Sequence, residues 1–175
     1  VKLGGIYTKT QDILNAKDIY ITACGTSWHA AQIGSYILES VLSKPIKVEY
    51  ASEFRYRNKH LNSDSLVISI SQSGETADTL SAVRKAKEHG ALTLGIVNVV
   101  GSSIARETDC GIYMHAGPEI GVASTKAFTS QVVILSLLGN YLAQQKGIED
   151  SYKVISHIQK VPIIMEELLK LSDSI

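Results

Sequence analysis

The feature that most constrains the fold is the segment Leu66–Ile70, Leu-Val-Ile-Ser-Ile, which is an almost unbroken run of apolar residues. A short run of this kind favours a β-strand, and its continuous apolar character indicates that both faces of the strand are covered. Strands covered on both faces are typical of parallel sheets that lie between layers of helices. We therefore expect Leu66–Ile70 to be a buried strand of an α/β fold.

Shorter β-prone runs alternate with helical patterns over the rest of the chain. Besides Leu66–Ile70, the expected strands are Asp18–Ala23, Ile46–Tyr50, Leu92–Val97 and Gly111–His115. The expected helices are Ser27–Leu42 with Ser27 as its N-cap, one turn at Ser102–Arg106, Ala77–His89 terminated by Gly90, and a long apolar helix over Ser124–Gln145. The polar segment Ala51–Ser63 is expected to be a surface connection with at most a short helix. This order predicts a mainly parallel sheet of roughly five strands flanked by helices.

The chain is expected to form one domain followed by a separate helix. Its 175 residues, 45% of them hydrophobic, suffice for one sizeable core and not for two, and we assign this domain to residues 1–150. An amphipathic pattern predicts a last helix over Ser151–Ser172, which Pro162 should kink or restart. The start, Val1–Gly5, has neither an initiator Met nor a secretory pattern, so we expect it to be a cut inside a longer chain.

Charge and hydropathy exclude several classes of function. The 17 basic and 17 acidic side chains cancel, which argues against a nucleic-acid partner. The apolar run Val132–Leu138 is far shorter than the roughly 18 residues that span a bilayer, so no membrane association is expected. The cysteines, Cys24 and Cys110, form no metal-type pair or disulfide framework, which favours a cytoplasmic protein.

Three loops should meet at the carboxyl edge of the sheet, where parallel α/β folds bind ligands: Cys24–Ser27, Ser71–Thr76 and Gly121–Lys126. All three are rich in hydroxyl groups and small residues. In the central loop, hydrogen-bond donors surround a glycine and precede a helix N-terminus, a combination that suits a phosphate dianion without any metal. These donors are the side chains of Ser71, Gln72, Ser73 and Thr76.

The alternative interpretation is that these hydroxyl groups merely cap helices, which is their commonest role at such positions. Capping needs one hydroxyl per helix, whereas the central loop supplies three and the first loop adds Thr26 and Ser27. The number of hydroxyls therefore favours an anion site. Neither a Gly-x-x-x-x-Gly-Lys-Ser/Thr nor a Gly-x-Gly-x-x-Gly motif is present, which argues against a nucleotide, and the scattered histidines show no metal-ligand spacing.

The motifs Cys-Gly-Thr-Ser from Cys24, Ser-Gln-Ser-Gly-Glu-Thr from Ser71 and Gly-Val-Ala-Ser-Thr-Lys-Ala-Phe-Thr-Ser-Gln from Gly121 resemble those of the glucosamine-6-phosphate synthase family, in the same order and at similar spacing. The resemblance covers nearly the whole chain. It implies an SIS-type three-layer sandwich that is the first sugar-isomerase (SIS) domain of the isomerase portion. Residues 151–175 would then lead toward a second SIS domain that this chain lacks.

The family makes glucosamine 6-phosphate from fructose 6-phosphate and glutamine-derived ammonia, uses no cofactor in this portion, and forms homodimers. The resemblance implies binding of fructose 6-phosphate, glucose 6-phosphate or glucosamine 6-phosphate. It also implies that the phosphate is bound by Ser27, Ser71, Gln72, Ser73 and Thr76. The sugar hydroxyls would be contacted by Thr26, Ser124 and the backbone of Val122.

The main catalytic groups of the family belong to a glutaminase domain and a second SIS half, so this chain alone is expected to be inactive. Alternatives are another SIS-fold ketose–aldose isomerase or deglycase, and a regulatory module that senses a phosphosugar. Cys24 ends a buried strand without an evident base, which argues against a nucleophile. Glu75 either orients a sugar hydroxyl or complements a helix dipole, and Lys126 either lends charge to the site or is an exposed helix residue.

Overall fold

A parallel sheet forms the centre of the molecule. The computed structural model describes residues 2–57, 60–121, 124–149 and 152–171. Its five strands lie in the order β2-β1-β3-β4-β5, and every neighbouring pair is parallel. The strands are β1 (Asp18–Ala23), β2 (Ile46–Tyr50), β3 (Ser65–Ser71), β4 (Leu92–Val97) and β5 (Cys110–Tyr113). The predicted fold class is confirmed.

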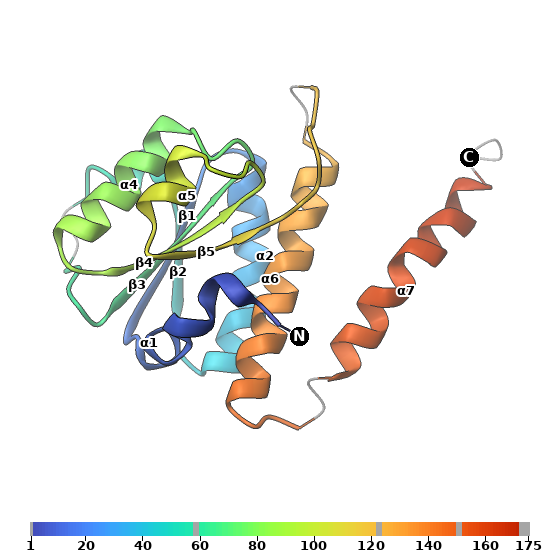
Figure 1. The fold of residues 1–175 in the computed structure, drawn as a ribbon, viewed down its shortest axis with the longest axis horizontal. Helices are drawn as coiled ribbons and strands as arrows, with labels where there is room; N and C mark the ends of the chain where they lie inside the picture. The colour runs from blue at the N-terminus through green and yellow to red at the C-terminus, as the bar shows by residue number, and fades with distance from the viewer. Residues whose placement is uncertain (1, 58–59, 122–123, 150–151, 172–175) are drawn as a thin grey trace.

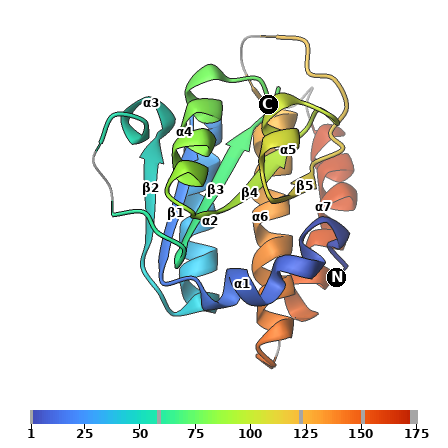
Figure 2. The same ribbon diagram turned by 60° about the vertical axis from the view of Figure 1, so that its left-hand side comes forward.

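Helices cover both faces of this sheet (Figures 1 and 2). One face carries the 3₁₀ helix η1 (Gly4–Lys9) and the helices α1 (Thr10–Asn15), α2 (Thr26–Leu42) and α6 (Lys126–Gln145). The other face carries α3 (Ala51–Phe54), α4 (Ala77–Glu88) and α5 (Ser103–Glu107). The molecule is therefore a three-layer sandwich.

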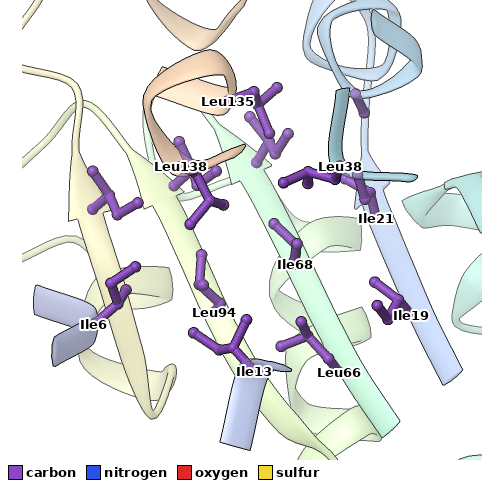
Figure 3. Packing of buried hydrophobic residues seen from close by; sticks show 14 of the residues in the cluster. Ile6, Ile13, Ile19, Ile21, Leu38, Leu66, Ile68, Leu94, Leu135 and Leu138 are labelled. Carbon is purple, nitrogen blue, oxygen red and sulfur yellow. The ribbon is translucent and has the colours of Figure 1, made fainter. Parts of the chain in front are cut away.

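The central strand β3 explains the core. All of its residues are buried, as its apolar run predicts. Because successive side chains of a strand point to opposite faces, Leu66 and Ile68 join the cluster beneath α2 and α6, and Val67 joins the cluster beneath α3 and α4. Figure 3 shows Leu66 and Ile68 beside Leu94 of β4, with Leu135 and Leu138 of α6 above them.

Helices α2 and α6 pack closely because glycines lie at their contact. A Cβ atom on Gly34 would lie 2.7 Å from the Leu135 side chain, and one on Gly139 would lie 2.7 Å from Ile37. A larger residue at either position would push the helices apart. This close packing sets the spacing of the two helix starts that border the candidate site.

Some element boundaries differ from those expected. Helix α2 begins at Thr26, and Gly25 is its N-cap with a φ of 57°, so the prediction that Ser27 is the N-cap is wrong. Helix α6 begins at Lys126 and not at Ser124, and β5 begins one residue earlier than predicted. The helices η1 and α1 were not predicted, because the first residues show no strong apolar period.

The last helix, α7 (Tyr152–Leu169), continues through Pro162, so a restart there does not occur. It lies beyond α6 and apart from the sheet (Figure 1). Large apolar side chains of its second half are exposed to solvent, among them Ile163, Leu168 and Leu169. Among the described residues, no helix is long and apolar enough to cross a membrane.

Gly5 offers a test of how tightly η1 packs on β5. A Cβ atom at Gly5 would lie 2.1 Å from the backbone oxygen of Gly111, whereas one at Gly4 would meet nothing within 4 Å. Gly5→Ala is therefore expected to lower the free energy of unfolding by about 1–3 kcal/mol, since a backbone atom cannot yield as a side chain can. Gly4→Ala, the matched control, should stay within about 0.5 kcal/mol. Urea unfolding of both variants measures this, and equal losses would contradict the packing.

Candidate functional site

The site lies where the strand order reverses, between β1 and β3. The chain leaves β1 into α2 on one face of the sheet and leaves β3 into α4 on the other face. Ala23 pairs with Ile70, so the two loops begin side by side. The point at which two loops diverge from adjacent parallel strands is the usual ligand position in such folds.

Ser71 and Thr76 form a hydrogen-bonded pair inside the central loop. The Ser71 hydroxyl oxygen accepts a bond from the backbone N–H of Gly74 at 2.9 Å and lies 3.0 Å from the Thr76 hydroxyl. Ser71 is only 2% exposed, and either hydroxyl of this pair can be the donor. Ser71 therefore helps to hold the loop together, and one hydroxyl hydrogen of the pair is left to donate to a ligand.

Ser73 is arranged in the same way. Its hydroxyl oxygen accepts a bond from the backbone N–H of Glu75 at 3.1 Å, which leaves the hydroxyl hydrogen able to donate outward. Thr76, the N-cap residue of α4, makes no side-chain capping bond, and Ser27 lies inside α2 and not at its N-cap, so helix capping does not explain these two hydroxyls.

Ser27, on the first turn of α2, is held from the opposite helix. The side-chain amide of Gln131 on α6 donates to the Ser27 hydroxyl oxygen at 2.9 Å. Sequence reasoning assigned no role to Gln131. A signal was present, because Gln131 is a polar residue on the apolar stripe that Ala127 and Leu135 continue, and it is buried there.

One pattern unites these contacts. Ser27 and Ser73 each accept a hydrogen bond from within the protein, so their own hydrogens are left to donate, and the Ser71–Thr76 pair keeps one further hydroxyl hydrogen. Such a set of oriented donors complements a negatively charged ligand. The remaining predicted residues lie around it: Thr26 is exposed at the first residue of α2, and Gln72 is partly buried in the central loop.

A hollow of about 510 Å³ adjoins Gln72 at the same edge of the sheet. Asn98, after β4, helps to shape it: its amide nitrogen donates to the backbone oxygen of Gly117 at 2.7 Å, and its amide oxygen accepts from the N–H of Ala116 at 2.8 Å. These bonds fix the start of the connection between β5 and α6 beside the central loop. His115 and Glu119 of this connection also line the hollow.

The third loop is organised by Glu119. Its carboxylate accepts bonds from the backbone N–H of Thr125 at 2.8 Å and from the Ser124 hydroxyl at 3.2 Å. The bond from the Thr125 N–H is the main cause that lowers the pKa of Glu119. Because the Ser124 hydrogen is engaged, Ser124 is left to act toward a ligand as an acceptor. Val122 lies outside the described residues, and Lys126 is exposed at the first residue of α6.

Glu75 has a structural role that the sequence left open. Its carboxylate accepts a bond from the backbone N–H of Ser103 at 2.8 Å and so caps the N-terminus of α5. Hydrogen bonds from Ser103, and the charge of Arg106, lower the pKa of Glu75 below its usual 4.5. Glu75 therefore does interact with the N-terminus of a helix, as one of the two predicted roles required, but this helix is α5 and not α4, which follows the loop.

Both cysteines pack against the core of the domain. Burial raises the pKa of the Cys110 thiol to about 11, and the charge of Asp109 adds to this shift, so the thiol is a poor nucleophile. Cys24 is partly buried, packs against the core beneath α4, and lies 3.8 Å from the Thr79 hydroxyl.

Comparison with known proteins gives the family. The family model for the SIS domain matches residues 12–141, most of the chain. This chain belongs to the SIS-domain family. Within the family, the chain is 53% identical to a glutamine–fructose-6-phosphate aminotransferase (isomerizing) from Chlorobaculum tepidum and 51% identical to one from Bacteroides thetaiotaomicron, over its whole length in both cases. It spans only 29% of the length of each of these relatives.

A solved structure of the same kind is also similar. The C-terminal domain of glucosamine-fructose-6-phosphate aminotransferase from Francisella tularensis superposes with a TM-score of 0.85 and is 39% identical. The match covers 96% of this SIS chain and 48% of that domain. The SIS sandwich that the motifs implied is thereby confirmed.

Gly74 tests the geometry of the central loop. Its φ is +69°, and a Cβ atom there would lie 2.0 Å from the Ser102 hydroxyl oxygen. Gly101 has a similar φ of +73° with nothing within 4 Å, so it is a matched control. Gly101→Ala should cost about 1–2 kcal/mol of unfolding free energy from backbone strain alone. Gly74→Ala should cost a further 1–3 kcal/mol or so from the clash. If urea unfolding gave equal losses of unfolding free energy for the two variants, the Ser102 side chain would be able to move away without cost, and the predicted clash would be wrong.

Glu75→Gln tests the cap on α5 through pH. A carboxylate with a lowered pKa in the folded state stabilises the fold above its unfolded pKa of about 4.5, and this contribution disappears as the pH falls through the folded value. The melting temperature of Glu75→Gln should therefore be below that of the unaltered chain at pH 7, and the difference should shrink below about pH 4.5. Glu88→Gln, an exposed control at the end of α4, should show no such loss. A difference that is independent of pH would contradict the cap.

Proposed function

We propose that this chain is the phosphosugar-binding SIS domain of a glutamine–fructose-6-phosphate aminotransferase (isomerizing). Its role would be to hold the 6-phosphate of fructose 6-phosphate, glucose 6-phosphate or glucosamine 6-phosphate while the amino sugar is made. The observation that carries this proposal is the orientation of the Ser27 and Ser73 hydroxyls, each of which accepts a bond from inside and can donate outward beside the Ser71–Thr76 pair. The names of the similar proteins support the same conclusion.

The proposed roles divide the donors into two groups. Ser27, Ser73 and Thr76 would donate hydroxyl hydrogens to phosphate oxygens, with the Gln72 amide as a further donor and the N-terminus of α4 facing the same anion. Ser71 would act together with Thr76, because the two hydroxyls share one hydrogen bond and either of them can be its donor. No divalent metal is needed for this mode of binding, since neutral donors and a helix dipole compensate the charge.

The sugar would lie toward the first and third loops. Thr26 is exposed at the start of α2, and Ser124 can accept a bond from a sugar hydroxyl because its own hydrogen is engaged by Glu119. The proposed backbone contact of Val122 falls outside the described residues. Lys126 and Glu119 are the charged groups nearest this part of the site along the chain.

The remainder of the reaction is proposed to belong to other parts of a longer protein. The chain spans under a third of its curated relatives, and we propose that residues 1–150 are the first SIS domain and residues 151–175 lead toward a second one. The catalytic base and the glutamine-hydrolysing groups would lie outside this chain, which alone would turn over nothing. A cytoplasmic homodimer is proposed for the assembled enzyme.

The proposal predicts that the chain distinguishes phosphorylated from unphosphorylated sugars. In a calorimetric titration it should bind fructose 6-phosphate and not fructose, and EDTA should leave the affinity unchanged. Ser73→Ala removes a bond to a charged group worth about 1.5–3 kcal/mol, so the dissociation constant should rise by roughly 10- to 150-fold. Stability should change little, since Ser73 is only partly buried and its one bond within the protein, from the Glu75 N–H, is in an exposed loop.

Ser40→Ala is the matched control for Ser73→Ala, since it removes an exposed hydroxyl near the far end of α2. Its affinity for fructose 6-phosphate should equal that of the unaltered chain. Equal affinity for fructose and fructose 6-phosphate would overturn the assignment of the central loop. A Ser73→Ala variant that loses stability and keeps its affinity would show that the hydroxyl only organises the loop.

A further inference from the structure

We propose that Gln131 is a positioning residue that fixes the Ser27 hydroxyl as a hydrogen-bond donor toward the ligand phosphate. This inference rests on the proposed function and extends it to a residue on the opposite helix. Gln131 would not touch the substrate itself. It would act by orienting the Ser27 hydroxyl so that the hydrogen, and not a lone pair of the oxygen, faces the anion.

The geometry of the contact supports this role. Gln131 is 1% exposed on α6, Ser27 is 8% exposed on the first turn of α2, and the amide nitrogen lies 2.9 Å from the hydroxyl oxygen. A primary amide nitrogen can only donate, so the Ser27 oxygen must be the acceptor. The single hydroxyl hydrogen is thereby turned away from Gln131 and left for another acceptor.

The opposite orientation of the amide would reverse the chemistry. If the amide oxygen faced Ser27, it would take the hydroxyl hydrogen, and lone pairs would face the phosphate and repel it. The amide oxygen of Gln131 is buried and has no hydrogen-bond partner among the described residues. Turning the amide would satisfy this oxygen but would leave the buried amide nitrogen, which now donates one bond to Ser27, with no acceptor for either of its N–H groups.

Close packing of the two helices keeps Gln131 in place. Gly34 of α2 accommodates Leu135, which is one turn beyond Gln131 on α6, and Gly139 accommodates Ile37. These contacts fix the distance between the helices on the same side as the hydrogen bond. Gln131 therefore holds Ser27 from a rigid support, which is what orienting a hydroxyl requires.

The competing explanation is that the bond only ties α2 to α6. A double-mutant cycle separates the two roles, because residues that act through one another are not additive. The dissociation constant for fructose 6-phosphate is measured by calorimetry for the unaltered chain, Gln131→Met, Ser27→Ala and the double variant. Melting temperatures are recorded in parallel.

We expect Gln131→Met to raise the dissociation constant by about 5- to 20-fold, and Ser27→Ala to raise it by a similar factor. The dissociation constant of the double variant should not exceed the higher of the two single-variant values. Gln131→Glu should weaken binding more than Gln131→Met, since its carboxylate would take the Ser27 hydrogen and add a negative charge near the anion. Leu138→Met, a buried substitution further along α6, is the control and should leave the affinity unchanged.

Three results would overturn the inference. In the first, Gln131→Met weakens binding by the same factor with and without Ser27→Ala. In the second, Gln131→Met lowers the melting temperature but spares the affinity, which would leave only a structural tie. In the third, the unaltered chain fails to bind fructose 6-phosphate, which rejects the proposed function and with it the premise of the inference. The first two results leave the proposed function standing, so the two failures can be told apart.

A second measurement does not depend on whether Gln131→Met folds. In the unaltered chain, the side-chain amide protons of Gln131 should exchange slowly with solvent, and one of them should change its chemical shift in Ser27→Ala. Two amide protons that exchange fast and ignore Ser27→Ala would contradict the bond and the inference.

Discussion

The parallel pairing of β1 with β3 is the constraint on which the rest of the structure depends. The carboxyl ends of parallel strands all lie at one edge of the sheet. Residues that are far apart in the chain, such as Ser27 and Ser71, are therefore brought to the same edge. The chain then departs to opposite faces, into α2 after β1 and into α4 after β3. The position of the candidate site is thus a consequence of topology, and the loop sequences decide what the site can bind.

A second layer of control comes from the packing of α2 against α6. Loops alone rarely hold hydroxyl groups in one orientation, because a hydroxyl rotates freely about its C–O bond. The site overcomes this freedom with internal donors: the Gly74 and Glu75 N–H groups for the central loop and the Gln131 amide for Ser27. Because these bonds exist before the ligand binds, no free energy of binding is needed to orient the hydroxyls, which is the advantage of a preorganised site.

The sequence predicted the elements better than the contacts between them. The strands and main helices follow from local apolar patterns, so their ranges agree with the structure to within a few residues. The N-cap of α2 was wrong because Gly25 takes a left-handed φ that the pattern does not reveal. The cap of α5 by Glu75 and the bond from Gln131 to Ser27 join residues 28 and 104 positions apart, and only the folded chain brings them together.

The use of neutral donors has a consequence for how the site would work. The central loop, Ser71–Thr76, contains no Lys or Arg, and its only charged residue, Glu75, is engaged in capping α5. Neutral hydrogen bonds to an anion are individually modest and directional, whereas a buried cation would attract any anion strongly and release it slowly. Under the proposed function, in which the domain binds a phosphosugar and later releases it, oriented hydroxyls are therefore an advantage. The proposed discrimination would then depend on their orientation, and the bonds from Gln131 and from the loop N–H groups are the contacts that can set it.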